Sequence, residues 1–315
     1  MNTDKIPLQL IQFFFVIGTA PLLVGWIGQC RAWLASRSGA GLLQPYRVLR
    51  KLFHKSPVVA YEASPLFRMA PYVIFSGMAL AGMIVPMTFT GLPFAPVADA
   101  ITLVGLFALT RILGALAAMD VGTPFGSMGA RREMLVGFLA EPALLIVLFT
   151  PALIGHSTSL AVIVTRLTAA RLVLYPSMAF AATAYTMVLL AENARIPVDN
   201  PDTHLELTMI HGALNLEYSG RYLALIEWAS AIKLLTYIAM GIALFLPWGI
   251  VRNGQWSHLP LALGIFIVKV AAAGAVLAVL ETLLAKMRLF RVPEFLGTAF
   301  MLAVLGLLVH FLLGA

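Results

Sequence analysis

The sequence carries very little charge for its length. Only 11% of its 315 residues are Asp, Glu, Lys or Arg, whereas 61% are hydrophobic. Soluble globular domains contain about 25% charged and about 45–50% apolar residues. A soluble fold of this length has no place to bury so much apolar surface, so the sequence indicates a membrane protein. The net charge of +7 then reports on membrane topology and not on nucleic-acid binding.

Cysteine and histidine are also scarce. The single Cys30 excludes an internal disulfide and an iron–sulfur cluster held by this chain alone, because such clusters usually take four thiolates. Of the six histidines only His310 falls in an expected membrane span, which argues against a di-haem cytochrome. His204 and His211 stand seven residues apart, a spacing more typical of a packed polar stripe than of a metal site. No Walker or GxGxxG motif is present, so we predict no metal, haem or nucleotide bound by this chain.

Long apolar windows predict an all-α polytopic protein with about eight membrane-spanning helices. A helix needs roughly 20 apolar residues to cross a hydrocarbon core of about 30 Å. We place the spans at 7–29, 69–92, 99–119, 134–155, 171–192, 222–247, 259–283 and 293–314. Residues 1–315 are expected to form one integral membrane domain, without the inverted repeat that marks many secondary transporters.

Lysine and arginine sort the connecting loops into two groups. Fourteen of them lie in or beside 30–68, 120–133, 193–221 and 284–292, and only Lys5, Arg166 and Arg252 lie in the other loops. Because cytoplasmic loops carry the excess of Lys and Arg, we expect these four loops in the cytoplasm and both termini outside.

The third of these loops concentrates the negative charge of the chain. The run AENARIPVDNPDTHLELTMIHGALNLEYSGR, residues 191–221, holds five of the fourteen acids: Glu192, Asp199, Asp202, Glu206 and Glu217. Asn200-Pro201-Asp202 is typical of a helix start, and we predict a helix from there to Gly212 or slightly beyond. An ordered acidic loop indicates a docking surface or an ion path.

Several ionisable residues fall inside the expected spans, where charge is costly and function is the first hypothesis. They are Arg111, Glu141, Arg171, Glu227, Lys233, Lys269 and Glu281. Arg171 and Glu281 lie near span ends and are expected to snorkel to the interface. Two interpretations stay open for the others. The carboxylates line a hydrated path into the bilayer, or they pair with cations, as Arg111 with Glu141, and hold the helices together.

Two groups of motifs resemble two related branches of one family. The run A-E-N-x-R-x-P-x-D from Ala191 to Asp199 and the run L-E-Y-S-G from Leu216 to Gly220 resemble subunit 1 of respiratory complex I. Three further stretches resemble the membrane-anchor subunit of group 4 energy-converting [NiFe] hydrogenases, such as formate hydrogenlyase and hydrogenase-4. These stretches are DNPDTHLELTMIH, AMDVGTPFGSMGARREM before Glu141-Pro142, and LLQPYRVLRKLFHK. The sequence departs from the family pattern at Gly212, where an acid is expected, and in a loose version of the basic Gly-Pro turn at residues 37–41.

The resemblance implies a membrane subunit without a catalytic residue or a cofactor of its own, in a bacterial or archaeal plasma membrane. The [NiFe] centre and iron–sulfur clusters are expected on its partners, the hydrogenase large and small subunits, and antiporter-like subunits are expected beside it. The docking residues implied are Arg37, Gln44, Arg47, Lys51, Arg132, Arg195, Tyr218 and Arg221. The residues implied in coupling to proton or sodium translocation are Arg111, Glu141, Glu192, Asp199, Asp202, Glu206, Glu217, Glu227 and Lys233.

Three alternatives remain at this point. The chain is the quinone-binding subunit 1 of complex I, a stand-alone transporter, or a structural anchor without ion coupling. The spacing from Glu206 to Glu217 and the presence of His204 disfavour the first alternative, and the lack of an inverted repeat disfavours the second.

Overall fold

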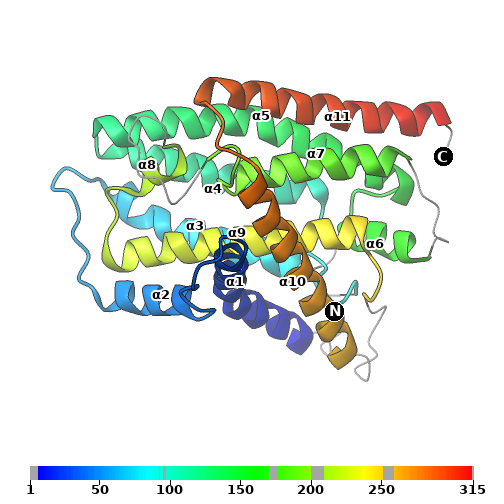
Figure 1. Cartoon of the computed structure of the whole chain (residues 1–315), viewed down its shortest axis with the longest axis horizontal. Helices are drawn as coiled ribbons and strands as arrows, with labels where there is room; N and C mark the ends of the chain where they lie inside the picture. Colours follow the sequence, from blue (N-terminus) through cyan, green and yellow to red (C-terminus); the bar gives the residue numbers. More distant parts are fainter. Residues whose placement is uncertain are drawn as a thin grey trace.

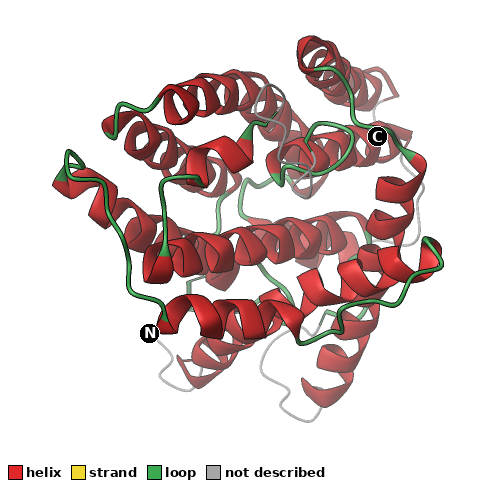
Figure 2. Ribbon diagram, turned by 60° about the vertical axis from the view of Figure 1, so that its left-hand side comes forward, coloured by secondary structure: helices red, strands yellow, loops and turns green. Residues whose placement is uncertain are grey.

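The computed structural model describes residues 6–91, 93–94, 97–169, 176–199, 209–250 and 259–313, and these residues are helical with short connections (Figures 1 and 2). The helices are α1 Ile6–Leu34, α2 Gln44–His54, α3 Pro65–Ile84, α4 Ala100–Asp120, α5 Pro124–Gly155, α6 Leu160–Ala169, α7 Pro176–Glu192, α8 His211–Asn215, α9 Gly220–Phe245, α10 Leu259–Leu283, the 3₁₀ turn η3 Leu289–Arg291 and α11 Val292–Leu313.

Seven helices of the described part are long and apolar enough to cross a membrane: α1, α3, α4, α5, α9, α10 and the segment Leu289–Leu312 that includes α11. The remaining expected span, 171–192, coincides with α7, of which 17 residues are described. The prediction of an all-α polytopic membrane protein is therefore confirmed. The expected span 69–92 is shifted, because α3 begins at Pro65 and ends at Ile84.

Helix α9 forms the centre of the bundle. In its most apolar window 78% of the residues are buried inside the protein, compared with 22% for α10 and for the α11 segment. It contacts α1, α2, α3, α7 and α10. Helices α5, α7 and α11 lie side by side on one side of α9 and α1 lies on the other, while α10 runs diagonally across α9 (Figure 1). A helix enclosed in this way can carry polar side chains that a lipid-facing helix cannot.

Two parts of the sequence-based prediction differ from the structure, and two connections contain helices that were not predicted from the sequence. Most of the expected loop 120–133 is helix, because Thr123 caps α5 and Pro124 occupies its first turn. The loop 30–68 contains the amphipathic α2, and the connection after α5 contains α6. In the predicted helix up to Gly212, residues 200–208 lie outside the described residues, while Met209 and Ile210 are not helical and α8 starts only at His211.

Two prolines inside membrane helices each leave one backbone carbonyl without its helical hydrogen bond. A side chain in α9 or just before it donates a hydrogen bond to that carbonyl instead. Proline lacks an N–H, so the carbonyl four residues earlier loses its helical donor. Pro71 frees the carbonyl of Phe67, which accepts from the Tyr218 hydroxyl at 3.1 Å. Pro21 frees the carbonyl of Ile17, which accepts from the indole N–H of Trp228 at 2.9 Å. Both helices are thereby joined to the central helix at their weakest points.

The Y-S-G part of the L-E-Y-S-G run has a structural role that follows from these contacts. The ring of Tyr218 stacks on Phe67 with centroids 4.0 Å apart. The Ser219 hydroxyl donates to the carbonyl of Val58 at 2.8 Å and accepts from its N–H at 2.7 Å. Gly220 has φ +55°, and a Cβ there would lie 2.6 Å from the carbonyl oxygen of Lys55. The run therefore joins the start of α9 to the loop between α2 and α3.

We predict that Tyr218→Phe lowers the free energy of unfolding by about 1–3 kcal/mol, because the buried carbonyl of Phe67 loses its donor while the ring stack stays. Unfolding of the purified chain in mixed micelles, titrated with a denaturing detergent, measures this difference. Tyr61→Phe is the matched control, since Tyr61 is fully exposed and its loss should change the free energy by less than about 0.5 kcal/mol. Equal losses in the two variants would contradict the proposed bond.

Candidate functional site

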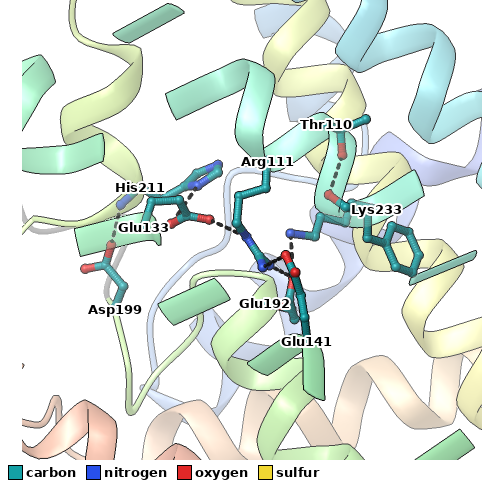
Figure 3. Close-up of polar contacts among 9 residues, drawn as sticks. Thr110, Arg111, Glu133, Glu141, Glu192, Asp199, His211 and Lys233 are labelled. Carbon is teal, nitrogen blue, oxygen red and sulfur yellow. Dashed lines mark hydrogen bonds and ion pairs between the residues drawn. The ribbon is translucent and has the colours of Figure 1, made fainter. Parts of the chain in front are cut away.

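Arg111, halfway along α4, lies at the centre of a buried charge cluster (Figure 3). Its guanidinium faces three carboxylates. Nε donates to Glu133 at 3.3 Å, Nη1 donates to Glu141 at 2.6 Å, and Nη2 donates to Glu192. Gly137 on α5 makes room for it, because a Cβ there would lie 2.5 Å from Nη1. One cation therefore joins α4 to both α5 and α7.

Lys233 on α9 brings a second cation to the same cluster. Its Nζ lies 3.0 Å from Oε2 of Glu192, the oxygen that also accepts from Arg111. Two cations thus face three carboxylates, which leaves one excess negative charge when all five groups are ionised. A buried site with unbalanced charge has a strong tendency to bind one more proton.

His211, the first residue of α8, lies outside the spanning helices and can hold that additional proton. Its Nδ1 lies 3.8 Å from Oε2 of Glu133. Burial lowers the pKa of His211, but the neighbouring Glu133 carboxylate outweighs this effect, so the pKa is raised above its ordinary value. With His211 protonated, the charges of the cluster balance.

Asp199 fixes α8 beside the cluster. Its Oδ2 accepts from the backbone N–H groups of Ile210 at 3.2 Å and His211 at 3.1 Å, which are free at a helix start. Its Oδ1 accepts from Lys286, in the loop before η3, at 3.0 Å. Arg132 donates to the carbonyl of Met209 at 2.7 Å. The position of His211 is therefore set by α5 and by two loops.

A cavity of about 70 Å³ lies against the cluster. Its polar lining includes Arg111, Glu133, Glu192, His211 and Lys233, and its apolar lining comes from α3, α4 and α9. A bound water needs about 10–15 Å³ of such space and two to four polar partners. The cavity therefore has room and partners for several waters beside the carboxylates, which is what proton transfer between them requires.

The predicted coupling residues separate into three groups. Arg111, Glu141, Glu192 and Lys233 meet in the cluster, with Asp199 at its edge. Glu217 and Glu227 lie near α8 and in α9 without an ion pair among the described residues, and the side chain of Glu227 is exposed. Asp202 and Glu206 lie outside the described residues. Glu281, expected to snorkel, is instead buried and paired with Arg195 at 3.0 Å and Arg31 at 3.7 Å.

The predicted docking residues are likewise not all on the surface. Arg37, Gln44, Arg47, Lys51 and Arg221 are exposed. Tyr218 is buried against Phe67, while Arg195 and Arg132 use their guanidinium groups inside the protein. The last three side chains support the loops from within. For the five exposed residues, docking stays a prediction.

Sequence reasoning missed Glu133 and the part that His211 takes. Glu133 directly follows Arg131-Arg132, and this basic pair placed it in a loop. The available signal is its spacing from Glu141: eight residues correspond to a little over two helical turns, which puts both carboxylates on one face of a continuous α5.

With the fold and the cluster described, the class of protein follows from comparison. Residues 7–312 match the family described as NADH dehydrogenase, and the chain belongs to this family. A solved structure of the membrane-bound sulfane sulfur reductase, an archaeal respiratory membrane complex, contains a chain with the same fold, with a TM-score of 0.80 and 18% identity over 95% of this chain and 96% of that one.

Two bacterial relatives narrow the similarity. Formate hydrogenlyase subunit 4 of Escherichia coli K12 is 33% identical over 297 residues, which is 94% of this chain and 96% of that protein. Hydrogenase-4 component C of the same organism is 34% identical over 298 residues, 94% of this chain and 93% of that protein. The resemblance seen in the loop motifs is thus confirmed over almost the whole chain.

We predict a pH-dependent contribution of His211 to stability. A raised folded-state pKa means that the His211–Glu133 pair contributes fully below the ordinary pKa of 6.5 and loses its contribution as the pH rises through the higher folded value. The difference in unfolding free energy between the natural chain and His211→Gln should therefore shrink as the pH is raised. His54→Gln, at an exposed position of α2, is measured in parallel as the control. A pH-independent difference at His211 would contradict the pairing.

Proposed function

We propose that this chain is the membrane subunit of a membrane-bound [NiFe] hydrogenase complex. It holds the hydrophilic part of the complex at the membrane and couples electron transfer there to translocation of protons, or of sodium ions, in the membrane. The observation that carries this proposal is the similarity, over about 94% of the chain, to two proteins named as subunits of formate hydrogenlyase and hydrogenase-4.

The exposed basic residues support a docking role. Arg47 and Lys51 lie on α2, and Arg37 lies just before it. Such a surface favours an acidic partner surface by charge complementarity. In the proposal this face is cytoplasmic and receives the hydrogenase large subunit and the iron–sulfur small subunit, which carry the [NiFe] centre and the clusters. This chain binds neither cofactor.

The charge cluster supports a coupling role. The cluster includes Lys233, well inside α9. The start of α9 is joined to the loop before α3 by the Y-S-G run, so the cluster lies farther along the same helix. At the other end, the Glu141 side chain is 28% exposed on α5, about one helical turn after the exposed Phe138. A partly exposed carboxylate at that depth is expensive in lipid. In the proposal it faces an adjacent antiporter-like subunit, which takes over the charge movement.

The quinone-binding subunit 1 of complex I remains the alternative of the same fold. Pockets for molecules of quinone size usually have volumes of about 300–1,000 Å³, whereas the cavity beside the cluster measures about 70 Å³ in the described part of the chain. This difference and the named relatives favour the hydrogenase function.

The first test is gentle purification of the chain from its native membrane, with mass spectrometry of the proteins that accompany it and an assay of hydrogen evolution from a reduced dye. We expect a [NiFe] large subunit and hydrogen evolution. Co-purification with NADH-oxidising subunits and quinone reductase activity would instead assign the chain to complex I, and recovery of the chain alone would favour a transporter.

We further predict that Glu141→Gln lowers the number of ions translocated per hydrogen molecule at least tenfold in membrane vesicles. The amide cannot take up and release a proton, so the last carboxylate of the cluster no longer titrates. Glu294→Gln, at an exposed carboxylate in the first turn of α11, is the matched control and should leave the ratio unchanged. An unchanged ratio in Glu141→Gln would remove Glu141 from the path, and the same measurement on Glu217→Gln and Glu227→Gln tests the remaining predicted acids.

A further inference from the structure

The two carboxylate oxygens of Glu192 have different surroundings. Oε2 accepts from Nη2 of Arg111 and lies 3.0 Å from Nζ of Lys233. Oε1 is buried and has no hydrogen-bond partner in the part of the chain that the structure describes. A buried carboxylate oxygen without a hydrogen bond has lost its contacts with water and gained none in the protein, which is unfavourable. A group near Oε1 that forms a hydrogen bond with it would compensate for this loss.

A second buried polar atom without a hydrogen-bond partner in the described part of the chain lies on α9, the helix that brings Lys233 to this carboxylate. Tyr237 lies on α9 one helical turn after Lys233, is fully buried, and its ring stacks on Phe107 with centroids 4.7 Å apart. Its hydroxyl makes no hydrogen bond within the described residues. The centre of the Tyr237 ring lies 6.0 Å from Nζ of Lys233, which itself lies 3.0 Å from Oε2 of Glu192, so Tyr237 borders the charge cluster.

The neighbouring Tyr185 provides a direct comparison. It is also buried and its ring packs against Tyr237, but its hydroxyl donates to the backbone carbonyl of Tyr237 at 2.5 Å. Its hydrogen-bonding capacity is therefore used inside the helix bundle. Of these two adjacent tyrosines, only Tyr237 has a hydroxyl available to the cluster.

We propose that Oε1 of Glu192 is the atom on which the cluster takes up its additional proton, and that Tyr237 is the residue that positions and stabilises it there. When Glu192 is ionised, the Tyr237 hydroxyl donates to Oε1, directly or through one water. When Glu192 is protonated, the new O–H donates to the oxygen of Tyr237, whose hydroxyl has rotated away.

In this step Tyr237 changes only its hydrogen bond and does not lose its proton. A hydronium ion in the cavity loses a proton and becomes water as the O–H bond on Oε1 forms, and release reverses this exchange. The contacts of Oε2 with Arg111 and Lys233 persist in both states, so loading does not require the helices to separate. The titratable and charged groups that face this site from the packed elements are Arg111 of α4, Glu133 and Glu141 of α5, Tyr185 of α7, His211 of α8 and Lys233 of α9. This inference rests on the proposed coupling function and specifies its proton-loading atom.

Tyr237→Phe tests the inference in the whole complex purified from its native membrane, because the variant keeps the ring stack on Phe107 and removes only the hydroxyl. Tyr185→Phe is the matched control. We expect the ions translocated per hydrogen molecule to fall at least tenfold in Tyr237→Phe and to stay within twofold in Tyr185→Phe. Assembly of both variants is checked by co-purification of the partner subunits.

Infrared difference spectra between the oxidised and reduced complex provide the readout that a purely structural role would not change. The carboxylic C=O band of protonated Glu192, assigned by its loss in Glu192→Gln, should shift to higher frequency in Tyr237→Phe and stay unshifted in Tyr185→Phe. An unshifted band together with normal translocation in Tyr237→Phe would overturn the inference. Normal translocation in Glu192→Gln and Glu141→Gln would instead overturn the coupling function itself.

Discussion

One guanidinium surrounded by three carboxylates determines how this bundle is built. A charge buried in a membrane protein is tolerated only with good partners, and removing one partner of a buried pair costs about 3–5 kcal/mol because the other charge is left behind. Arg111 stays protonated, so its charge must be compensated by acidic side chains of neighbouring helices. They come from α5 and α7, and the Glu192 carboxylate recruits Lys233 from α9. The central helices therefore have one register in which these charges meet, and hydrophobic packing, which is not directional, has to conform to it.

The loops extend this constraint to the rim of the membrane domain. Asp199 holds the start of α8 and accepts from Lys286, while Arg195 and Arg31 meet on the buried Glu281. Each contact satisfies a group that would otherwise be buried and unpaired. The stretch 191–221 holds five of the fourteen acids, and its described part is thus held from several sides, with the charged groups of Asp199 and Arg195 turned to partners inside the protein.

Hydropathy predicts the fold class well, because lipid imposes length and polarity on every spanning helix. The sidedness of the loops, expected from Lys and Arg, stays a prediction. The pairing of Arg111 with Glu141 was one of two interpretations available from the sequence, since a buried cation needs a nearby acid. Local signals were less reliable. The helix start predicted at Asn200-Pro201 lies outside the described residues, whereas α8 begins where Asp199 accepts from the backbone N–H groups of Ile210 and His211, a contact that no local signal shows. The contribution of Glu133 depends on α5 continuing through a glycine-rich, basic segment that composition alone assigns to a loop.

The cluster also limits how a redox event at the surface can act on the membrane interior. A mechanical account needs a second conformation of loop and helices, and two states must be demonstrated before coupling is called allosteric. An electrostatic mechanism does not need a second conformation of the helices. With two cations and three carboxylates, the cluster differs by one proton between a balanced and an unbalanced state, and His211 and Glu192 are two places for that proton at opposite sides of Arg111. In the proposed function, a change of charge on a docked partner would shift the proton between these places while every helix stays where it is, because charges act across a low-dielectric interior without any atom of the backbone moving.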